Sequence, residues 1–289
     1  MIQLIKSRSE FSNLRKTING SVGLVPTMGN LHSGHLGLLN KALKENDCAV
    51  ITIFVNPTQF GPNEDFDKYP RTLEQDVEKI KEMMSLEKIE RPVYIFAPSS
   101  TAEVYGDNFH TFINVTEITD VLCGAKRPGH FQGVATVVYK LFSLTKPTKA
   151  YFGQKDYQQV LVIKTMAKNL DLDLEIITCD IARSAEGLAL SSRNQYLSDD
   201  EKILALHLNK TLNKIKTELQ KGSFTDAFAA INLILEQEQK NSRWDYLEVL
   251  DANNLKEVGP ETNKVVVAGA YKINQTRLID NLLVDIIYA

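Results

Sequence analysis

The chain of 289 residues has only three cysteines, Cys48, Cys123 and Cys179, and they lie far apart. This spacing indicates neither a disulfide framework nor a C-x-x-C metal site. The N-terminal segment "MIQLIKSRSEF" lacks the apolar run of a signal peptide, and no other segment is long and apolar enough to span a membrane. We therefore expect a protein of the reducing cytoplasm.

A strong excess of charge is also absent. The formal net charge is −3, so a broad basic face for nucleic acid is not expected. The sequence contains no repeat and no low-complexity segment. Hydrophobic residues make up 43% and charged residues 24%, which is ordinary for a protein with a substantial core. The length suits one large domain or two modest ones.

Short apolar segments alternate with amphipathic ones up to about residue 181. The predicted strands are 22–25, 48–55, 93–97, 150–153 and 174–181. Four helices are predicted in this part of the chain. The first begins after Ser33 as N-cap, and the second begins at a capping box formed by Thr72 and Gln75. The third and fourth cover roughly 131–145 and 156–170. This alternation predicts an α/β fold with a doubly wound parallel sheet.

The pattern changes after residue 181. Two helices are predicted at 199–222 and 225–239, followed by strands at 244–251, 264–272 and 277–287 with no helix between them. We therefore expect a second, smaller α+β domain that begins within 182–200. The division adopted is 1–181 for the first domain and 182–289 for the second.

Polar segments with unusual composition follow four of the predicted strands. They are 26–35, 56–72, 153–159 and 183–194. Loops at the carboxyl ends of parallel strands lie at one edge of the sheet, so these segments are expected to form one ligand crevice.

The first of these segments, "PTMGNLHSGH", has two glycines spaced as in a phosphate-binding P-loop. His35 and Leu36 stand where that loop needs a lysine and a hydroxyl. His32 and His35 lie three residues apart at a helix start, where both can face an anion and donate to a triphosphate. The alternative is one surface histidine and one packed histidine beside an ordinary turn. No third ligand lies near enough in sequence to favour a metal pair.

The segment "GQKDYQQ" supplies Lys155, which can contact a phosphate, and Asp156, which can bind ribose or a magnesium-associated water. Gln158 and Gln159 cannot both face the same way on a helix, so one of them is the candidate for a substrate contact. The alternative is a solvated helix start with Asp156 as N-cap.

Two further loops offer anion-binding groups. "LSSRN" (190–194) has two hydroxyls and a guanidinium, although it also fits a polar linker. Arg127 and His130 lie near another helix start and suit an anion. Gln59 lies beside a Gly/Pro-rich loop that is either a mobile flap or a long connection.

Taken in order, five motifs resemble those of the pantothenate synthetase (pantoate–β-alanine ligase) family over essentially the whole chain. They are "PTMGNLHSGH", "FVNPTQFGPNEDFDKYPRT", "RPGHFQGVATVV", "FGQKDYQQ" and "GLALSSRNQYLS". The resemblance implies a Rossmann-like ATP- and pantoate-binding domain over 1–181, of the nucleotidylyltransferase and class I synthetase superfamily, and a lid domain over 182–289. It also implies a cytoplasmic homodimer that uses ATP and Mg²⁺ to join pantoate and β-alanine, releasing AMP and pyrophosphate. "HSGH" then resembles the H-x-G-H signature of enzymes that act at the α-phosphate.

The resemblance also implies roles for individual residues. His35 matches the assigned proton donor, and His32 and Lys155 are implied to act beside it at the phosphates. Gln59 matches a contact to pantoate and β-alanine, and Gln159 a contact to pantoate. The positions that match ATP contacts are Met28, Gly29, Asn30, Leu31, His32, Ser33, Gly34, His35, Gly153, Gln154, Lys155, Asp156, Ala182, Leu190, Ser191, Ser192 and Arg193.

Departures from the family pattern are few. Leu190 stands where many members have Met, Asn30 replaces a small apolar residue, and "LCGAK" (122–126) is unusual. None removes a reacting group. Rival interpretations are a nucleotidylyltransferase of the same fold, which would not need Gln59 and Gln159, and a non-catalytic nucleotide sensor. A tRNA synthetase would need a basic tRNA-binding extension that the sequence does not show.

Overall fold

The structure, a computed structural model, describes residues 1–62, 64–221 and 223–286. The chain divides into two compact units. The first unit comprises Met1–Thr119, Arg127–Gln154 and Gln159–Asp180, and the second comprises Asp120–Lys126, Lys155–Gln158 and the chain from Ile181 onward. Two short segments of the range 1–181, and its last residue Ile181, therefore belong to the second unit. The domain division taken from the sequence remains a prediction.

The first unit is built on a six-stranded sheet in the order β1-β4-β3-β2-β5-β6, in which every neighbouring pair of strands is parallel. The strands are β1 (Ile2–Ile5), β2 (Val22–Thr27), β3 (Cys48–Ile53), β4 (Val93–Phe96), β5 (Lys149–Gly153) and β6 (Glu175–Cys179). Strand β3 has the sequence "CAVITI", and every residue except the last, the half-buried Ile53, is buried, as expected for a parallel strand covered on both faces.

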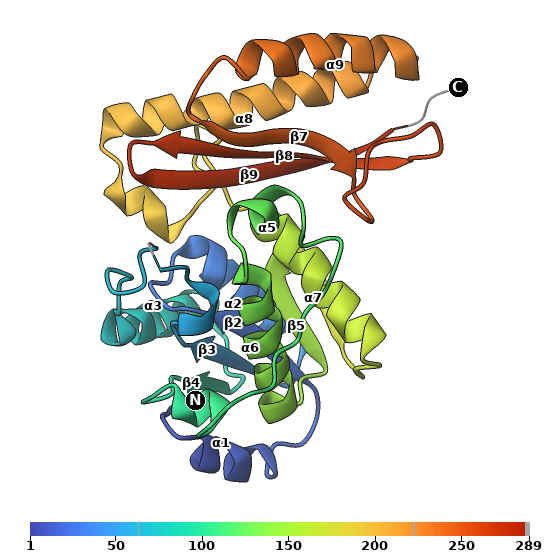
Figure 1. The fold of residues 1–289 in the computed structure, drawn as a ribbon. Helices are drawn as coiled ribbons and strands as arrows, with labels where there is room; N and C mark the ends of the chain where they lie inside the picture. The colour runs from blue at the N-terminus through green and yellow to red at the C-terminus, as the bar shows by residue number, and fades with distance from the viewer. Residues whose placement is uncertain (63, 222, 287–289) are drawn as a thin grey trace. The chain divides into compact units, whose positions relative to one another are not determined.

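Helices cover both faces of this sheet (Figure 1). They are α1 (Arg8–Arg15), α2 (Ser33–Glu45), α3 (Leu73–Leu86), α4 (Ala102–Tyr105), α6 (His130–Thr145) and α7 (Tyr157–Asn169). Leu39 of α2 and Ile80 of α3 share one core cluster with Ile95 of β4. Phe96, the next residue of β4, points to the opposite face and packs on Phe11 of α1, with ring centroids 5.2 Å apart.

The order of the strands reverses at β2. Strands β3 and β4 lie to one side of β2, and the chain then crosses to β5 and β6 on its other side. In a doubly wound sheet, the crevice beside such a switch point is where ligands bind. The segment that follows β2 is "MGNLHSGH", so the topology puts the glycine- and histidine-containing turn at this point.

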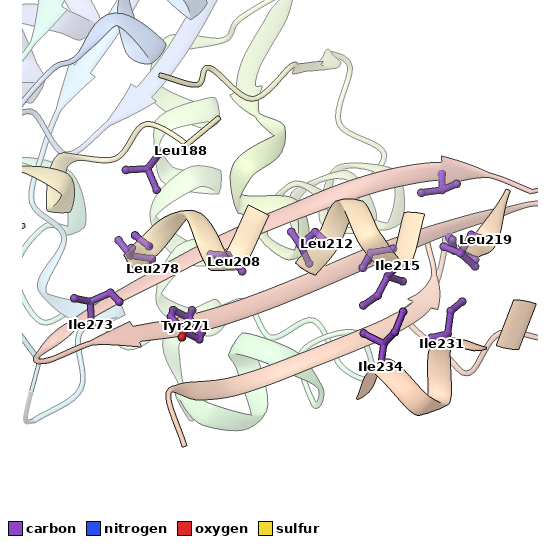
Figure 2. Packing of buried hydrophobic residues seen from close by; sticks show 14 of the residues in the cluster. Leu188, Leu208, Leu212, Ile215, Leu219, Ile231, Ile234, Tyr271, Ile273 and Leu278 are labelled. Atoms are coloured by element: carbon purple, nitrogen blue, oxygen red, sulfur yellow. The ribbon is translucent and has the colours of Figure 1, made fainter. Parts of the chain in front are cut away.

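The second unit contains an antiparallel sheet of β7 (Trp244–Asp251), β8 (Lys264–Ile273) and β9 (Thr276–Asp285). Helix α8 (Asp199–Leu219) packs on this sheet and α9 (Phe224–Glu238) packs on α8. Figure 2 shows their shared core, in which Leu208, Leu212 and Ile215 of α8 face Leu278 and Tyr271 of the sheet. This unit also holds the short helix α5 (Leu122–Lys126).

The predicted fold class is confirmed, with a parallel α/β unit and a smaller α+β unit. Strand β1 and helices α1, α4 and α5 were not predicted. Of these, Ile2–Ile5, Ala102–Tyr105 and Leu122–Lys126 are too short to show a clear hydrophobic period. Within the described ranges, no helix is long and apolar enough to span a membrane.

Candidate active site

The turn between β2 and α2 depends on two consecutive residues in the left-handed region, Gly29 (φ 81°) and Asn30 (φ 50°). A Cβ atom at Gly29 would lie 2.9 Å from Cγ2 of Ile53 and 3.1 Å from Oδ2 of Asp76, so only glycine fits. The buried Asp76 carboxylate accepts the backbone N–H of Asn30 at 2.9 Å and that of Leu31 at 2.7 Å. The turn is therefore fixed from α3.

Asp76 is a residue that sequence reasoning missed. The predicted Thr72–Gln75 capping box is wrong: Thr72 makes no capping hydrogen bond, and its hydroxyl donates instead to Oδ2 of Asp76 at 3.2 Å. The sequence feature that could have indicated Asp76 is its position between Leu73 and Ile80, which places an acidic residue on the apolar stripe of an amphipathic helix. A charged group at a buried helical position needs partners, and here those partners are the N–H groups of the turn.

Both histidines take part in capping α2. The predicted N-cap Ser33 is wrong, because the N-cap is His32 and Ser33 is the first helical residue. The Nδ1 atom of His32 accepts the N–H of Gly34 at 3.1 Å, and Nδ1 of His35 accepts the N–H of His32 at 3.4 Å. A neutral imidazole whose Nδ1 accepts carries its proton on Nε2. The cap therefore makes Nε2 of each neutral ring a hydrogen-bond donor, and the two ring centroids lie 4.0 Å apart.

Gln59 and Met28, predicted as separate substrate and ATP contacts, lie together in the first unit. Gln59 ends the short 3-10 helix η1 (Pro57–Gln59) that follows β3. Its Nε2 atom lies 3.1 Å from Sδ of Met28, and its Oε1 accepts from Nδ2 of Asn56 at 3.1 Å. The Gln59 side chain is thus oriented from two sides.

Asn56 is the second residue that sequence reasoning missed. It is 1% exposed, its Oδ1 accepts from the Tyr105 hydroxyl at 2.7 Å, and its Nδ2 also donates to the Gly133 carbonyl at 3.2 Å. Helix α6 approaches closely here, since a Cβ at Gly133 would lie 2.3 Å from the Thr58 carbonyl oxygen. The signal was a polar residue between an apolar strand and Pro57.

Arg127 and His130 brace the loop after β3, and their suitability for an anion stays a prediction. Arg127 is paired with Glu64 through Nε at 2.6 Å and through Nη2, and its Nη1 lies 3.0 Å from Nε2 of His130. Nδ1 of His130 lies 2.8 Å from the Gln59 carbonyl oxygen. Burial disfavours the charged form of Glu64, but the hydrogen bonds and positive charge of Arg127 outweigh it and hold the pKa of Glu64 below its usual range. The brace thus fixes the backbone of Gln59.

The second unit carries most of the remaining predicted ATP contacts. Lys155 lies in the 3-10 turn η2 (Gln154–Asp156), with Nζ 3.6 Å from Oδ2 of Asp156. Leu190 N–H donates to the Ala182 carbonyl at 2.8 Å, which brings two predicted ATP contacts together. Ser191 caps the 3-10 helix η3 (Ser192–Tyr196) by accepting the N–H of Arg193 at 3.2 Å. Lys155 and Ser191 line one small cavity together with Asp280.

The two adjacent glutamines have different environments. Gln158 is 6% exposed, accepts the N–H of Cys123 at 3.0 Å and donates to the Val121 carbonyl at 2.8 Å. Its amide is therefore used inside the second unit. Gln159 is half-buried and belongs to the first unit, so it remains the candidate for a substrate contact.

Comparison with known proteins identifies the family. A family model described as pantoate-beta-alanine ligase matches residues 2–283. A pantothenate synthetase of Acetivibrio thermocellus is 48% identical over 288 residues, covering 99% of each chain. The chain belongs to the pantoate–β-alanine ligase family. The resemblance of the five motifs is thereby confirmed, and the chain is an enzyme of this ligase family.

Solved structures of this ligase family share the fold. Pantothenate synthetase from Thermus thermophilus superposes with a TM-score of 0.85 at 39% identity, covering 98% of this chain and 99% of that chain. Pantoate-β-alanine ligase from Francisella tularensis, solved in complex with beta-gamma ATP and β-alanine, has a TM-score of 0.72 at 33% identity and covers 98% of each chain. The match includes both the parallel sheet and the small antiparallel sheet.

Proposed function

We propose that this enzyme condenses pantoate with β-alanine to form pantothenate in two steps, with ATP as co-substrate and pantoyl adenylate as intermediate. The support is membership of the ligase family, together with the ATP and β-alanine complex of the Francisella tularensis protein. A carboxylate does not acylate an amine in water at neutral pH, so the carboxylate needs an activating leaving group. We also propose that the enzyme is a cytoplasmic homodimer.

The observation that carries the proposal is the pair of capping histidines at the switch point of the sheet. The N-terminus of α2 provides backbone N–H groups and a positive dipole end, and Nε2 of His32 and of His35 adds a donor on each ring. In the first step, a pantoate carboxylate oxygen bonds to the α-phosphorus, and the bond to the bridging oxygen breaks with its electron pair leaving on pyrophosphate. Donors at this position stabilise the charge that develops there, with His35 as proton donor.

In the second step, the amine of β-alanine attacks the acyl carbon of the adenylate. The carbon–oxygen bond to AMP breaks, AMP takes the electron pair, and the amine loses a proton to give the amide. We assign pantoate orientation to Gln59 and Gln159, and β-alanine contact to Gln59. The Asn56 hydrogen bond to Gln59 restricts its amide, which favours a fixed geometry for attack.

The remaining ATP contacts are proposed as the sequence indicates. Lys155 would contact the phosphates as a point charge, with the Ser191 and Ser192 hydroxyls and the Arg193 guanidinium beside it. The ATP-binding set comprises Met28, Gly29, Asn30, Leu31, His32, Ser33, Gly34, His35, Gly153, Gln154, Lys155, Asp156, Ala182, Leu190, Ser191, Ser192 and Arg193.

Magnesium would enter with the nucleotide. Mg²⁺ is usually held by substrate phosphates, water and one or two carboxylates. The Asp156 carboxylate, 3.6 Å from Lys155 Nζ, has the donor chemistry for such a contact. In the part of the chain that the structure describes, no three His, Cys, Asp or Glu residues cluster as a metal site. When bound, the ion would neutralise phosphate charge during release of pyrophosphate.

Product analysis tests this proposal against the nucleotidylyltransferase alternative. Purified protein with ATP, Mg²⁺, pantoate and β-alanine should yield AMP and pyrophosphate in equal amounts, with one pantothenate for each AMP. Omission of either pantoate or β-alanine should abolish steady-state turnover. ADP and orthophosphate as products, or a product that retains the nucleotide, would overturn the proposed reaction.

A further inference from the structure

Strand β9 of the second unit carries two adjacent buried polar residues, Asp280 and Asn281. Each is 3% exposed. Successive side chains of a strand point to opposite faces, so the two residues act on different sides of the small sheet. Burial of polar groups is unfavourable unless they are hydrogen-bonded, and their partners therefore indicate what each residue holds in place.

Asp280 holds a hairpin that connects two proposed ATP contacts. Its carboxylate pairs with both terminal nitrogens of Arg183, at 2.6 and 2.8 Å. Nη1 of Arg183 also donates to the Gly187 carbonyl at 3.1 Å, which closes the turn of the hairpin. At the base of this hairpin, the N–H of Leu190 donates to the carbonyl of Ala182 at 2.8 Å. Asp280 of strand β9 is thus connected to the two proposed ATP contacts through one ion pair and a short hairpin.

Asn281 holds the turn that carries Lys155. Its Nδ2 atom donates to the backbone carbonyl of Lys155 at 2.9 Å. The side chain of Lys155 is only 19% exposed and lines the small cavity with Ser191 and Asp280. A long lysine side chain gains a defined phosphate contact only if its backbone is fixed, because the free side chain has many rotamers.

We propose that Asp280 and Asn281 are positioning residues for ATP, with Asn281 acting through Lys155 and Asp280 acting through Arg183. Neither residue is assigned a contact with the nucleotide itself. The inference rests on the proposed phosphate contact of Lys155. A displacement of about 1 Å of a positioning group can lower a rate by about 100-fold, so a single lost hydrogen bond at this place has a measurable effect.

The test is a double-mutant cycle between Asn281→Ala and Lys155→Ala, read as kcat/KM for ATP. In the wild-type background, Asn281→Ala is expected to lower kcat/KM for ATP by about 10-fold or more. In the Lys155→Ala background, it should lower this value less than about twofold, because the group it positions is gone. Equilibrium binding of a non-hydrolysable ATP analogue gives the same comparison if turnover of the double variant is too slow.

Two variants control for folding. Asp285→Asn changes an exposed residue of the same strand and should leave kcat/KM for ATP unchanged, since the Asp285 side chain is 79% exposed. Asn281→Leu keeps about the size of the side chain and removes the Nδ2 donor without adding a charge, so it should reproduce Asn281→Ala. It takes the place of Asn281→Ala in the cycle if that protein does not fold.

Arg183→Lys tests the second half of the inference. It keeps a positive charge but loses the paired bonds to Asp280, so it should lower kcat/KM for ATP in both backgrounds. An unchanged value in both backgrounds would overturn the role of Asp280.

The outcomes separate this inference from the proposed function. Unchanged kcat/KM for ATP in Lys155→Ala alone would refute the proposed role of Lys155, and the role of Asn281 with it. A strong defect in Lys155→Ala, combined with an equal Asn281→Ala effect in both backgrounds, would refute only the positioning role. No effect of Asn281→Ala in the wild-type background would also refute it.

Discussion

Oδ1 of Asp76 accepts a hydrogen bond at 2.7 Å from the backbone N–H of Leu31, a residue 45 positions earlier in the chain. Oδ2 of the same carboxylate accepts the N–H of Asn30 at 2.9 Å. One buried side chain of α3 therefore fixes the turn that leads into the two capping histidines. Among the residues that the structure describes, no other group accepts these two N–H donors.

Asp76→Ala should lower both stability and activity. Leaving a buried donor unsatisfied costs about 1–3 kcal/mol, so the loss of two partners should reduce the free energy of unfolding by about 2 kcal/mol or more. Urea denaturation at neutral pH measures this value. Glu74→Ala is the matched control, because Glu74 lies in the same helical turn but is exposed. An equal effect of both substitutions would show that Asp76 acts only through the helix dipole.

Two glycine-to-alanine substitutions should have opposite effects. Gly133→Ala would place a Cβ 2.3 Å from the Thr58 carbonyl oxygen, forcing α6 away from η1. We expect a loss of about 1–3 kcal/mol and a raised KM for pantoate, because Gln59 follows Thr58. Gly37→Ala lies on the exposed side of α2 with open space around it, and should stabilise the protein by up to about 1 kcal/mol. Thermal unfolding and steady-state kinetics of both variants measure the contrast.

The alternation of strands and helices could be predicted from the sequence because each element has its own hydrophobic period. Strand β3 is apolar throughout, and α8 repeats Leu208, Leu212 and Ile215 along one face. The proposed site residues could be assigned from the sequence because each lies in or beside one of the five motifs, and their roles stay predictions. Their supporting residues could not. Asp76 accepts from Asn30 and Leu31, which lie about 45 residues earlier in the chain. Asn56 contacts Gln59 three residues on, but it is held in place by Tyr105 and Gly133 of distant segments. The sequence marks both residues as polar at an unusual position but does not show which partners they take.

The capping of α2 shows a second limit of local rules. Serine is a common N-cap, so Ser33 was the residue expected to begin the helix. His32 takes this position instead, because Nδ1 of His32 accepts the N–H of Gly34 while Nδ1 of His35 accepts the backbone N–H of His32. Histidine is not among the preferred capping residues, and propensity therefore favoured the wrong residue.

The Glu64–Arg127 pair should make stability depend on pH. The pKa of Glu64 is lowered in the folded protein, so ionised Glu64 stabilises the fold at neutral pH. This contribution is present above the pKa of an unfolded glutamate, about 4.3, and is lost as the pH falls through the lower folded pKa. Glu64→Gln should therefore be less stable than wild type at pH 7, and the difference should shrink progressively below about pH 4.3. Urea denaturation at a series of pH values measures it, and a difference that grows towards acid would contradict the assignment.

The adenylate mechanism makes its sharpest prediction for isotope exchange with His35→Ala. If pantoate is activated before the amine attacks, labelled pyrophosphate should enter ATP when pantoate is present and β-alanine is absent. His35→Ala should reduce this exchange by about 100-fold or more, the usual scale for loss of one donor to developing charge.

His110→Ala is the matched control, since His110 is exposed and belongs to the same unit. Unfolding of both variants by urea separates lost chemistry from lost capping, because His35 also accepts the N–H of His32. Exchange that proceeds without pantoate, or that requires β-alanine, would rule out a pantoyl adenylate. Exchange at the wild-type rate in His35→Ala would leave His35 with its capping role alone.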